Sequence, residues 1–258
     1  MTDREETMYI YTCAEDFESM MTCIFDVWAA RHGSQNVRLE IEPVGQQEMF
    51  GTYVHIDRDT TKFQKVTRSI QNGISWEAYR QVYLAAMSDE DDRLDAIYRF
   101  LLLGFSVGRT VTKRMADAPV MRLFELSRRA GNDMHYYREF TRFTRIDPGI
   151  YVAHIEPDCN IVGLVAWHFE DRMPSENWIL IDDRRRIAAV HQADQPFYVT
   201  ELGEEEFLQL QKTEKYRDIY TVLWQEFFQT IAIRARENPD CQRTLFPLHY
   251  RRHAPEFQ

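Results

Sequence analysis

The sequence PVMRLFELSRRAGNDMHYYREFTRFTR, residues 119–145, decides how the middle of this chain folds. At about 100° per residue of an α-helix, its apolar side chains fall on one face and its cations on the other. The apolar face holds Leu123, Leu126, Ala130, Met134, Tyr137 and Phe140. The opposite side holds Arg128, His135, Arg138, Arg142 and Arg145. The pattern predicts one long helix that buries its apolar face and presents a row of cations.

The distribution of charge along the chain indicates what this row of cations binds. The formal net charge is -10, yet residues 93–145 hold 11 Lys or Arg against 5 Asp or Glu, net +6. Concentrated cations in an acidic chain indicate one defined anionic partner, with phosphate as the first candidate, and disfavour a non-specific DNA coat. The plain alternative is a solvated helix face. A second basic cluster contains Arg234, Arg236, Arg243, Arg251 and Arg252.

Length and composition exclude several classes of protein. The 258 residues are 44% hydrophobic, enough for a large core in one domain or two small ones. No segment approaches the roughly 18 apolar residues of a membrane-spanning helix, and the acidic start is unlike a secretory signal. Cys13, Cys23, Cys159 and Cys241 lack metal-ligand spacing. We therefore expect a cytoplasmic protein without membrane contact, metal or cofactor.

Periodicity and capping residues predict an α+β fold, helix-rich with a small, mostly antiparallel sheet. Helices are expected over residues 17–30, 60–71, 75–87, 88–104, 119–145, 160–172 and 216–236, and strands over 9–11, 37–41, 52–56, 150–155, 178–181, 187–191 and 197–202. We expect a single compact unit over 1–258. Its expected sub-structure is a helix-rich part, 1–146, and a part with a strand hairpin and a C-terminal helix, 147–258.

Several motifs in one order resemble a bacterial family described as probable DNA metabolism proteins. They are Tyr9-Ile10-Tyr11, Leu103 to Gly108, Ile155-Glu156-Pro157-Asp158-x-Asn160-Ile161, His168-Phe169-x-Asp171-Arg172-x-Pro174, Asn177-Trp178-Ile179, Ile231-Ala232-Ile233, Asn238-Pro239-x-x-Gln242-Arg243 and Pro247-x-x-Tyr250. The resemblance implies a partner that is a radical-SAM iron–sulfur protein with a helix-hairpin-helix DNA-binding region. In some relatives a similar domain is joined to a uracil-DNA-glycosylase-like domain. No catalytic mechanism comes with it.

The chemistry of single residues suggests two kinds of site. Candidate phosphate-binding or nucleic-acid-binding residues are Arg138, Arg142, Arg145, Arg172, Arg185, Arg243 and Tyr250. Arginine forks suit phosphate, and a tyrosine either stacks on a base or anchors the tail. Candidate acid–base residues are His135, His168 and Asp182. For each, packing or a solvated surface is the plain alternative.

Three functions follow from these residues. The first is an accessory DNA-metabolism or DNA-repair protein that binds nucleic acid, or a DNA-bound partner, through a basic surface. The second is an enzyme acting on nucleic acid or a nucleotide through a His/Arg/Asp pocket. The third is an adaptor whose basic face meets an acidic protein. A shared site predicts that residues of separate elements converge, namely His135, Arg142, His168, Arg172, Arg185 and Arg243.

Overall fold

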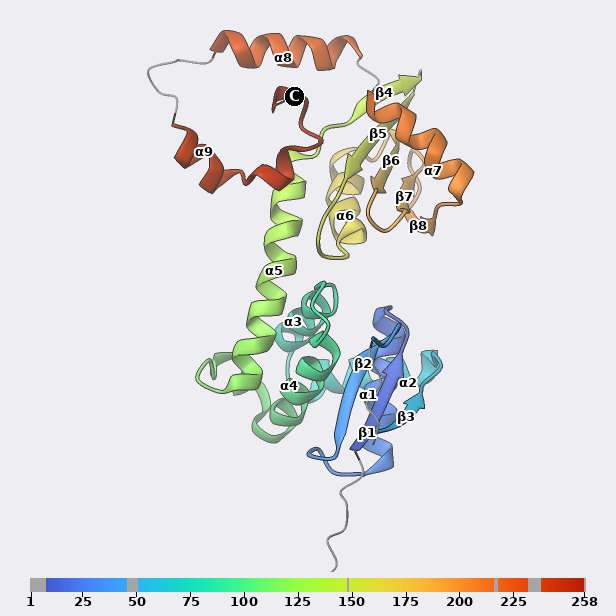
Figure 1. Ribbon diagram of the computed structural model, residues 1–258, viewed down its shortest axis with the longest axis vertical. Helices are drawn as coiled ribbons and strands as arrows, with labels where there is room; N and C mark the ends of the chain where they lie inside the picture. The colour runs from blue at the N-terminus through green and yellow to red at the C-terminus, as the bar shows by residue number, and fades with distance from the viewer. Residues whose placement is uncertain (1–7, 46–50, 148, 216–217, 232–237, 258) are drawn as a thin grey trace, which may run out of the picture. The chain divides into compact units, whose positions relative to one another are not determined.

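The computed structural model of the chain describes residues 8–45, 51–147, 149–215, 218–231 and 238–257 (Figure 1). The chain forms two compact units, Met1–Gly131 and Asn132–Gln258. The boundary falls within a long helix, whereas the sequence placed a division after residue 146. That the whole chain forms one unit stays a prediction.

The N-terminal unit contains a three-stranded sheet in the order β2-β1-β3. Its strands are β1 (Met8–Cys13), β2 (Val37–Ile41) and β3 (Gly51–His55), and both pairings are parallel. Helix α1 (Phe17–Ala30) connects β1 to β2, and such a crossover returns the chain in the same direction. The expectation of a mostly antiparallel sheet is therefore wrong for this unit.

Helices complete the core of this unit. They are α2 (Thr60–Gly73), α3 (Trp76–Ala86), α4 (Arg93–Val107) and the 3₁₀ helix η1 (Gly108–Lys113). Ser75 caps α3 as expected, because its hydroxyl accepts the Ala78 amide at 3.0 Å. The sequence predicted that this helix begins at residue 88, whereas α4 begins at Arg93 and residues 89–92 precede it. Met20, Ile24, Ile70, Ile97 and Leu101 are fully buried together.

Helix α5 (Ala118–Phe140) carries the opening sequence motif but ends earlier than expected. Leu123, Leu126, Ala130 and Tyr137 are buried, so the apolar face is confirmed. After Phe140 the chain becomes strand β4 (Thr144–Asp147), which pairs antiparallel with its successor. The β-branched residues Thr141, Thr144 and Ile146 favour a strand here, although the arginines continue the helical stripe. The expected helix over 141–145 is wrong, and Arg142 and Arg145 lie beyond the helix.

The C-terminal unit contains a five-stranded mixed sheet in the order β4-β5-β6-β7-β8 (Figure 1). Its other strands are β5 (Ile150–Ile155), β6 (Asn177–Asp182), β7 (Ile187–His191) and β8 (Tyr198–Glu201). Helix α6 (Val162–Arg172) connects β5 to β6, which pair in parallel. The remaining pairs are antiparallel, including the expected β6–β7 hairpin.

Short helices follow the sheet. They are α7 (Glu204–Gln211), η2 (Lys212–Lys215), α8 (Ile219–Ile231), α9 (Pro239–Leu245), η4 (Leu248–Arg251) and η5 (Pro255–Phe257). The expected helix over 216–236 is represented by α8; Arg234, Arg236 and the motif residues Ala232 and Ile233 lie outside the described residues. Along the described ranges, no helix is both long and apolar enough to cross a bilayer.

Candidate functional site

Two helices of the C-terminal unit bring together three of the predicted site residues. The Arg138 Nη2 of α5 donates a hydrogen bond to the Leu164 carbonyl of α6 at 3.1 Å. His168 and Arg172 follow Leu164 at steps of four residues, so they continue along the same stripe of α6. Arg138, His168 and Arg172 are called the cationic face below.

The surroundings of His168 lower its pKa. Burial lowers the pKa of the half-buried His168 imidazole, and the nearby cations Arg138 and Arg172 lower it further. The carboxylates Asp171 and Glu139 oppose this shift with smaller effects. Two guanidinium groups therefore act on one imidazole, because a like charge disfavours its protonated form.

The surroundings of the cationic face are open to solvent. Arg172 is exposed at the end of α6, and His135 is exposed on α5, three residues before Arg138. Fixed positive charge at a solvent-accessible surface is the chemical requirement for binding an anion.

Arg142 and Arg145 lie beside α8. The Arg142 guanidinium donates to a Glu256 carboxylate oxygen at 2.8 Å and lies over the Trp224 ring, 5.6 Å from its centroid. The backbone amide of Arg145 donates to the Asp218 carboxylate at 3.0 Å, and its side chain is exposed. Arg142 follows the last turn of α5, whose Glu139 carbonyl also accepts a hydrogen bond from its guanidinium at 3.0 Å, and Arg145 lies in strand β4.

Asp182 and Arg185 form an ion pair at the β6–β7 turn. Asp182 is fully buried and accepts the backbone amides of Arg184 and Arg185 at 3.0 and 3.1 Å. Burial raises the pKa of Asp182, and the Arg185 guanidinium, 3.2 Å away, opposes that shift. Arg185 also donates to the carbonyls of Pro157 and Asp158. These contacts tie the turn to the loop after β5, a structural role.

The last two predicted residues also have partners within the C-terminal unit. The exposed Arg243 pairs with Asp240, three residues earlier on α9. Tyr250 is buried, donates its hydroxyl hydrogen to Asp133 and stacks on Tyr136 with 4.4 Å between ring centroids. These are the contacts of a tail anchor rather than of a base-stacking residue.

The contacts therefore divide the six residues that were expected to share one site among several places in the C-terminal unit. His168 and Arg172 belong to the cationic face, and His135 lies on the helix that supplies Arg138. Arg142 lies beside α8. Arg185 and Arg243 are held in ion pairs of their own.

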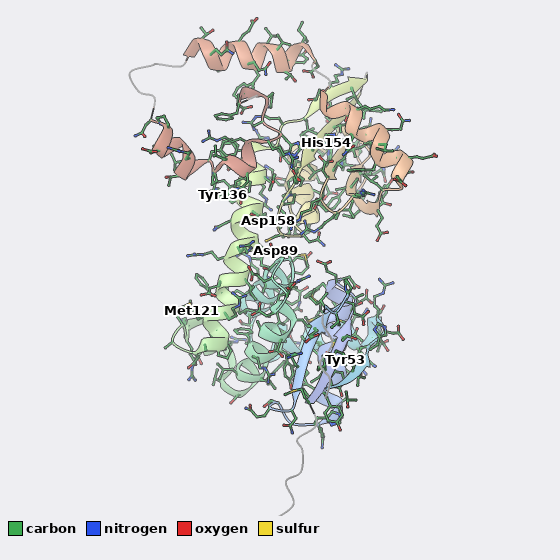
Figure 2. All side chains as sticks on the ribbon, viewed as in Figure 1. Tyr53, Asp89, Met121, Tyr136, His154 and Asp158 are labelled. Carbon is green, nitrogen blue, oxygen red and sulfur yellow. The ribbon has the colours of Figure 1, made fainter. Side chains whose placement is uncertain are left out.

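One buried network was missed by the sequence reasoning. His154 of β5 (Figure 2) contacts the Asp183 carboxylate through Nδ1 at 3.0 Å and the Thr213 hydroxyl through Nε2 at 3.0 Å. The Thr213 hydroxyl donates its hydrogen to the Leu210 carbonyl at 2.6 Å. In a nucleophilic relay the hydroxyl gives its proton to the imidazole. Here the Thr213 hydrogen is donated to the Leu210 carbonyl, so the network instead attaches η2 to the sheet. Partners 29 and 59 residues away left no local sequence signal.

Among the described residues, no group of three or more His, Cys, Asp or Glu side chains is arranged to hold a metal ion. The arrangement in the C-terminal unit thus offers cations and hydrogen-bond donors, the chemistry of anion recognition.

Comparison with known proteins gives the family. No curated protein matches the chain. A family model described as a domain of unknown function, DUF4130, matches residues 91–256, which is more than half of the chain. The chain therefore belongs to the DUF4130 family.

Proposed function

We propose that the chain is an accessory protein of DNA metabolism that binds nucleic-acid phosphates through its cationic face. The observation that carries this proposal is the placement of Arg138, which is bonded to the Leu164 carbonyl, on the stripe of α6 that also carries His168 and Arg172. Positive charge that disfavours a protonated imidazole favours a bound anion for the same reason. The planar fork of an exposed arginine such as Arg172 matches phosphate oxygens two at a time.

The net charge of the chain limits how it would bind DNA. At -10 overall, the protein repels a polyanion everywhere except near its cations. We therefore expect modest affinity from the isolated protein. A DNA-bound partner would raise the apparent affinity by holding the protein close to the DNA. The resemblance to probable DNA metabolism proteins names the class of that partner, a radical-SAM protein with a helix-hairpin-helix region.

Catalysis with His135, His168 and Asp182 as acid–base groups stays a prediction. Asp182 is fully buried, and its oxygens accept hydrogen bonds from Arg184 and Arg185. Binding needs only the exposed part of the cationic face, so it is the function that the geometry supports better.

His168 itself reports whether an anion binds at this face. A phosphate beside Arg138 and Arg172 would offset their effect and raise the pKa of His168. The measurement is an NMR pH titration of the His168 ring, with and without a short oligonucleotide. A rise in the His168 pKa, with the exposed His249 as the internal control, is expected. An unchanged His168 pKa at saturating oligonucleotide would contradict the proposal.

A further inference from the structure

Helix α8 turns three aromatic side chains outward. Tyr220, Trp224 and Phe227 are 67%, 40% and 53% exposed. Their spacing of four and three residues places them on one face. The polar residues Thr221 and Gln225 are the more buried ones, and Gln225 donates to the Pro255 carbonyl at 2.6 Å. An ordinary surface helix shows the reverse pattern, with aromatics buried and polar residues exposed.

Positive charge accompanies this aromatic face. The Arg142 guanidinium lies over the Trp224 ring at 5.6 Å, a cation–π contact. The exposed Arg145 is fixed through its backbone to Asp218. Asp218 also accepts the Thr221 amide at 2.7 Å, so its carboxylate is engaged at the start of the helix. Between Ile219 and Ile231 the sequence contains one charged residue, Glu226.

We propose that α8 is a base-stacking platform, so that the ligand of the proposed function is single-stranded nucleic acid. Tyr220, Trp224 and Phe227 supply ring faces for bases, and Arg142 and Arg145 take the intervening phosphates. This arrangement of aromatic rings and cations is the one that binds single strands without sequence preference. A duplex keeps its base faces stacked inside the helix and cannot use such rings.

The geometry of the rings suits this role. The centroids of Trp224 and Phe227 lie 6.0 Å apart at an interplanar angle of 34°. The two rings are therefore tilted and not stacked face to face, so neither ring covers the other. The occupant is a polyanion, because Arg145 keeps an exposed guanidinium at the start of α8 and Arg142, which pairs with Glu256, can exchange that carboxylate for a phosphate.

The test compares three ligands of equal length by fluorescence anisotropy on the full chain. They are a labelled thymidine oligonucleotide, its duplex, and an abasic strand with the same phosphates. The wild type should bind the thymidine strand at least about tenfold more tightly than the abasic strand. Tyr220→Ala with Trp224→Ala should remove that preference and keep the salt dependence, which reports phosphates. Leu223→Ala removes an exposed aliphatic side chain of the same helix and should change affinity less than about twofold.

Several outcomes would overturn the platform. Equal binding of duplex and single strand would do so, as would an unaffected double variant. If Arg172→Ala weakens binding while the aromatic variant does not, the proposed function stands and the platform fails. If the wild type binds none of the three ligands, both fail. Self-association that is lost equally in the Leu223 and Trp224 variants would make α8 a protein-docking face.

Discussion

The Arg142 guanidinium and the Glu256 carboxylate lie 2.8 Å apart, and the Glu256 side chain is 3% exposed. One carboxylate oxygen accepts the Arg142 hydrogen, whereas the other is buried and has no hydrogen-bond partner within the described part of the chain. A buried carboxylate oxygen without a partner costs free energy. The C-terminal segment therefore holds Arg142 with a carboxylate whose hydrogen bonds are incompletely satisfied.

Replacing this carboxylate should strengthen nucleic-acid binding. In Glu256→Gln, a phosphate no longer has to displace an anion from Arg142, so affinity for a single strand should rise by about two- to tenfold. Anisotropy titration measures this change. Glu201→Gln, which removes an exposed carboxylate from the same unit, is the matched control and should behave as the wild type. An increase of the same size in both variants would mean that only the net charge matters.

The stability of the protein should depend on His168 between neutral and acidic pH. The folded-state pKa of His168 is lowered from 6.5, so the unfolded chain binds its proton first as the pH falls. Stability contributed by this group is complete above pH 6.5 and declines as the pH falls from there toward the folded-state pKa. Urea unfolding at several pH values should show a shallower dependence for His168→Gln than for the wild type. Parallel curves for both proteins would assign the pH dependence to other groups.

Tyr250 should matter for stability and not for nucleic acid. Tyr250→Phe removes the hydrogen bond to the buried Asp133, whose other oxygen accepts the Cys159 amide at 3.0 Å. The loss should lower the free energy of unfolding by about 1–3 kcal/mol, measured by urea denaturation. Tyr198→Phe, at a side chain in β8 that is 59% exposed, should change it by less than about 0.5 kcal/mol. Weaker DNA binding by a stably folded Tyr250→Phe would return this residue to the nucleic-acid site.

Local patterns predicted the elements well, and contacts between distant elements poorly. The helix over 17–30, the strand over 37–41 and the Ser75 cap were expected at the right residues, because periodicity and capping are local properties. The parallel pairing of β1 and of β5 with β6 was missed, since a strand pattern does not name its partner. The end of α5 was missed because Arg142 and Arg145 continue the spacing of the helical stripe, although the β-branched Thr141 and Thr144 favour a strand.

The candidate site shows the same difference between local features, which the sequence predicted, and long-range contacts, which it did not. The pairing of His168 with Arg172 followed from their spacing of four residues, and the face of Arg138 from the helical wheel. The internal partners of Arg142, Arg185 and Tyr250 come from residues 114, 28 and 117 positions away along the chain. The sequence shows which residues are arginines, whereas the carboxylate or carbonyl that accepts their hydrogen bonds depends on the tertiary fold.

The salt dependence of single-strand binding tests the central claim most directly. Anisotropy titrations at several salt concentrations compare the wild type with Arg172→Ala and with Arg243→Ala, which also removes one exposed arginine of the same unit. If the cationic face binds phosphate, Arg172→Ala should weaken binding and reduce the magnitude of the log K against log salt slope by about 0.7. Arg243→Ala, whose cation is paired with Asp240, should leave both unchanged. Superimposable curves for the wild type and Arg172→Ala would contradict the account.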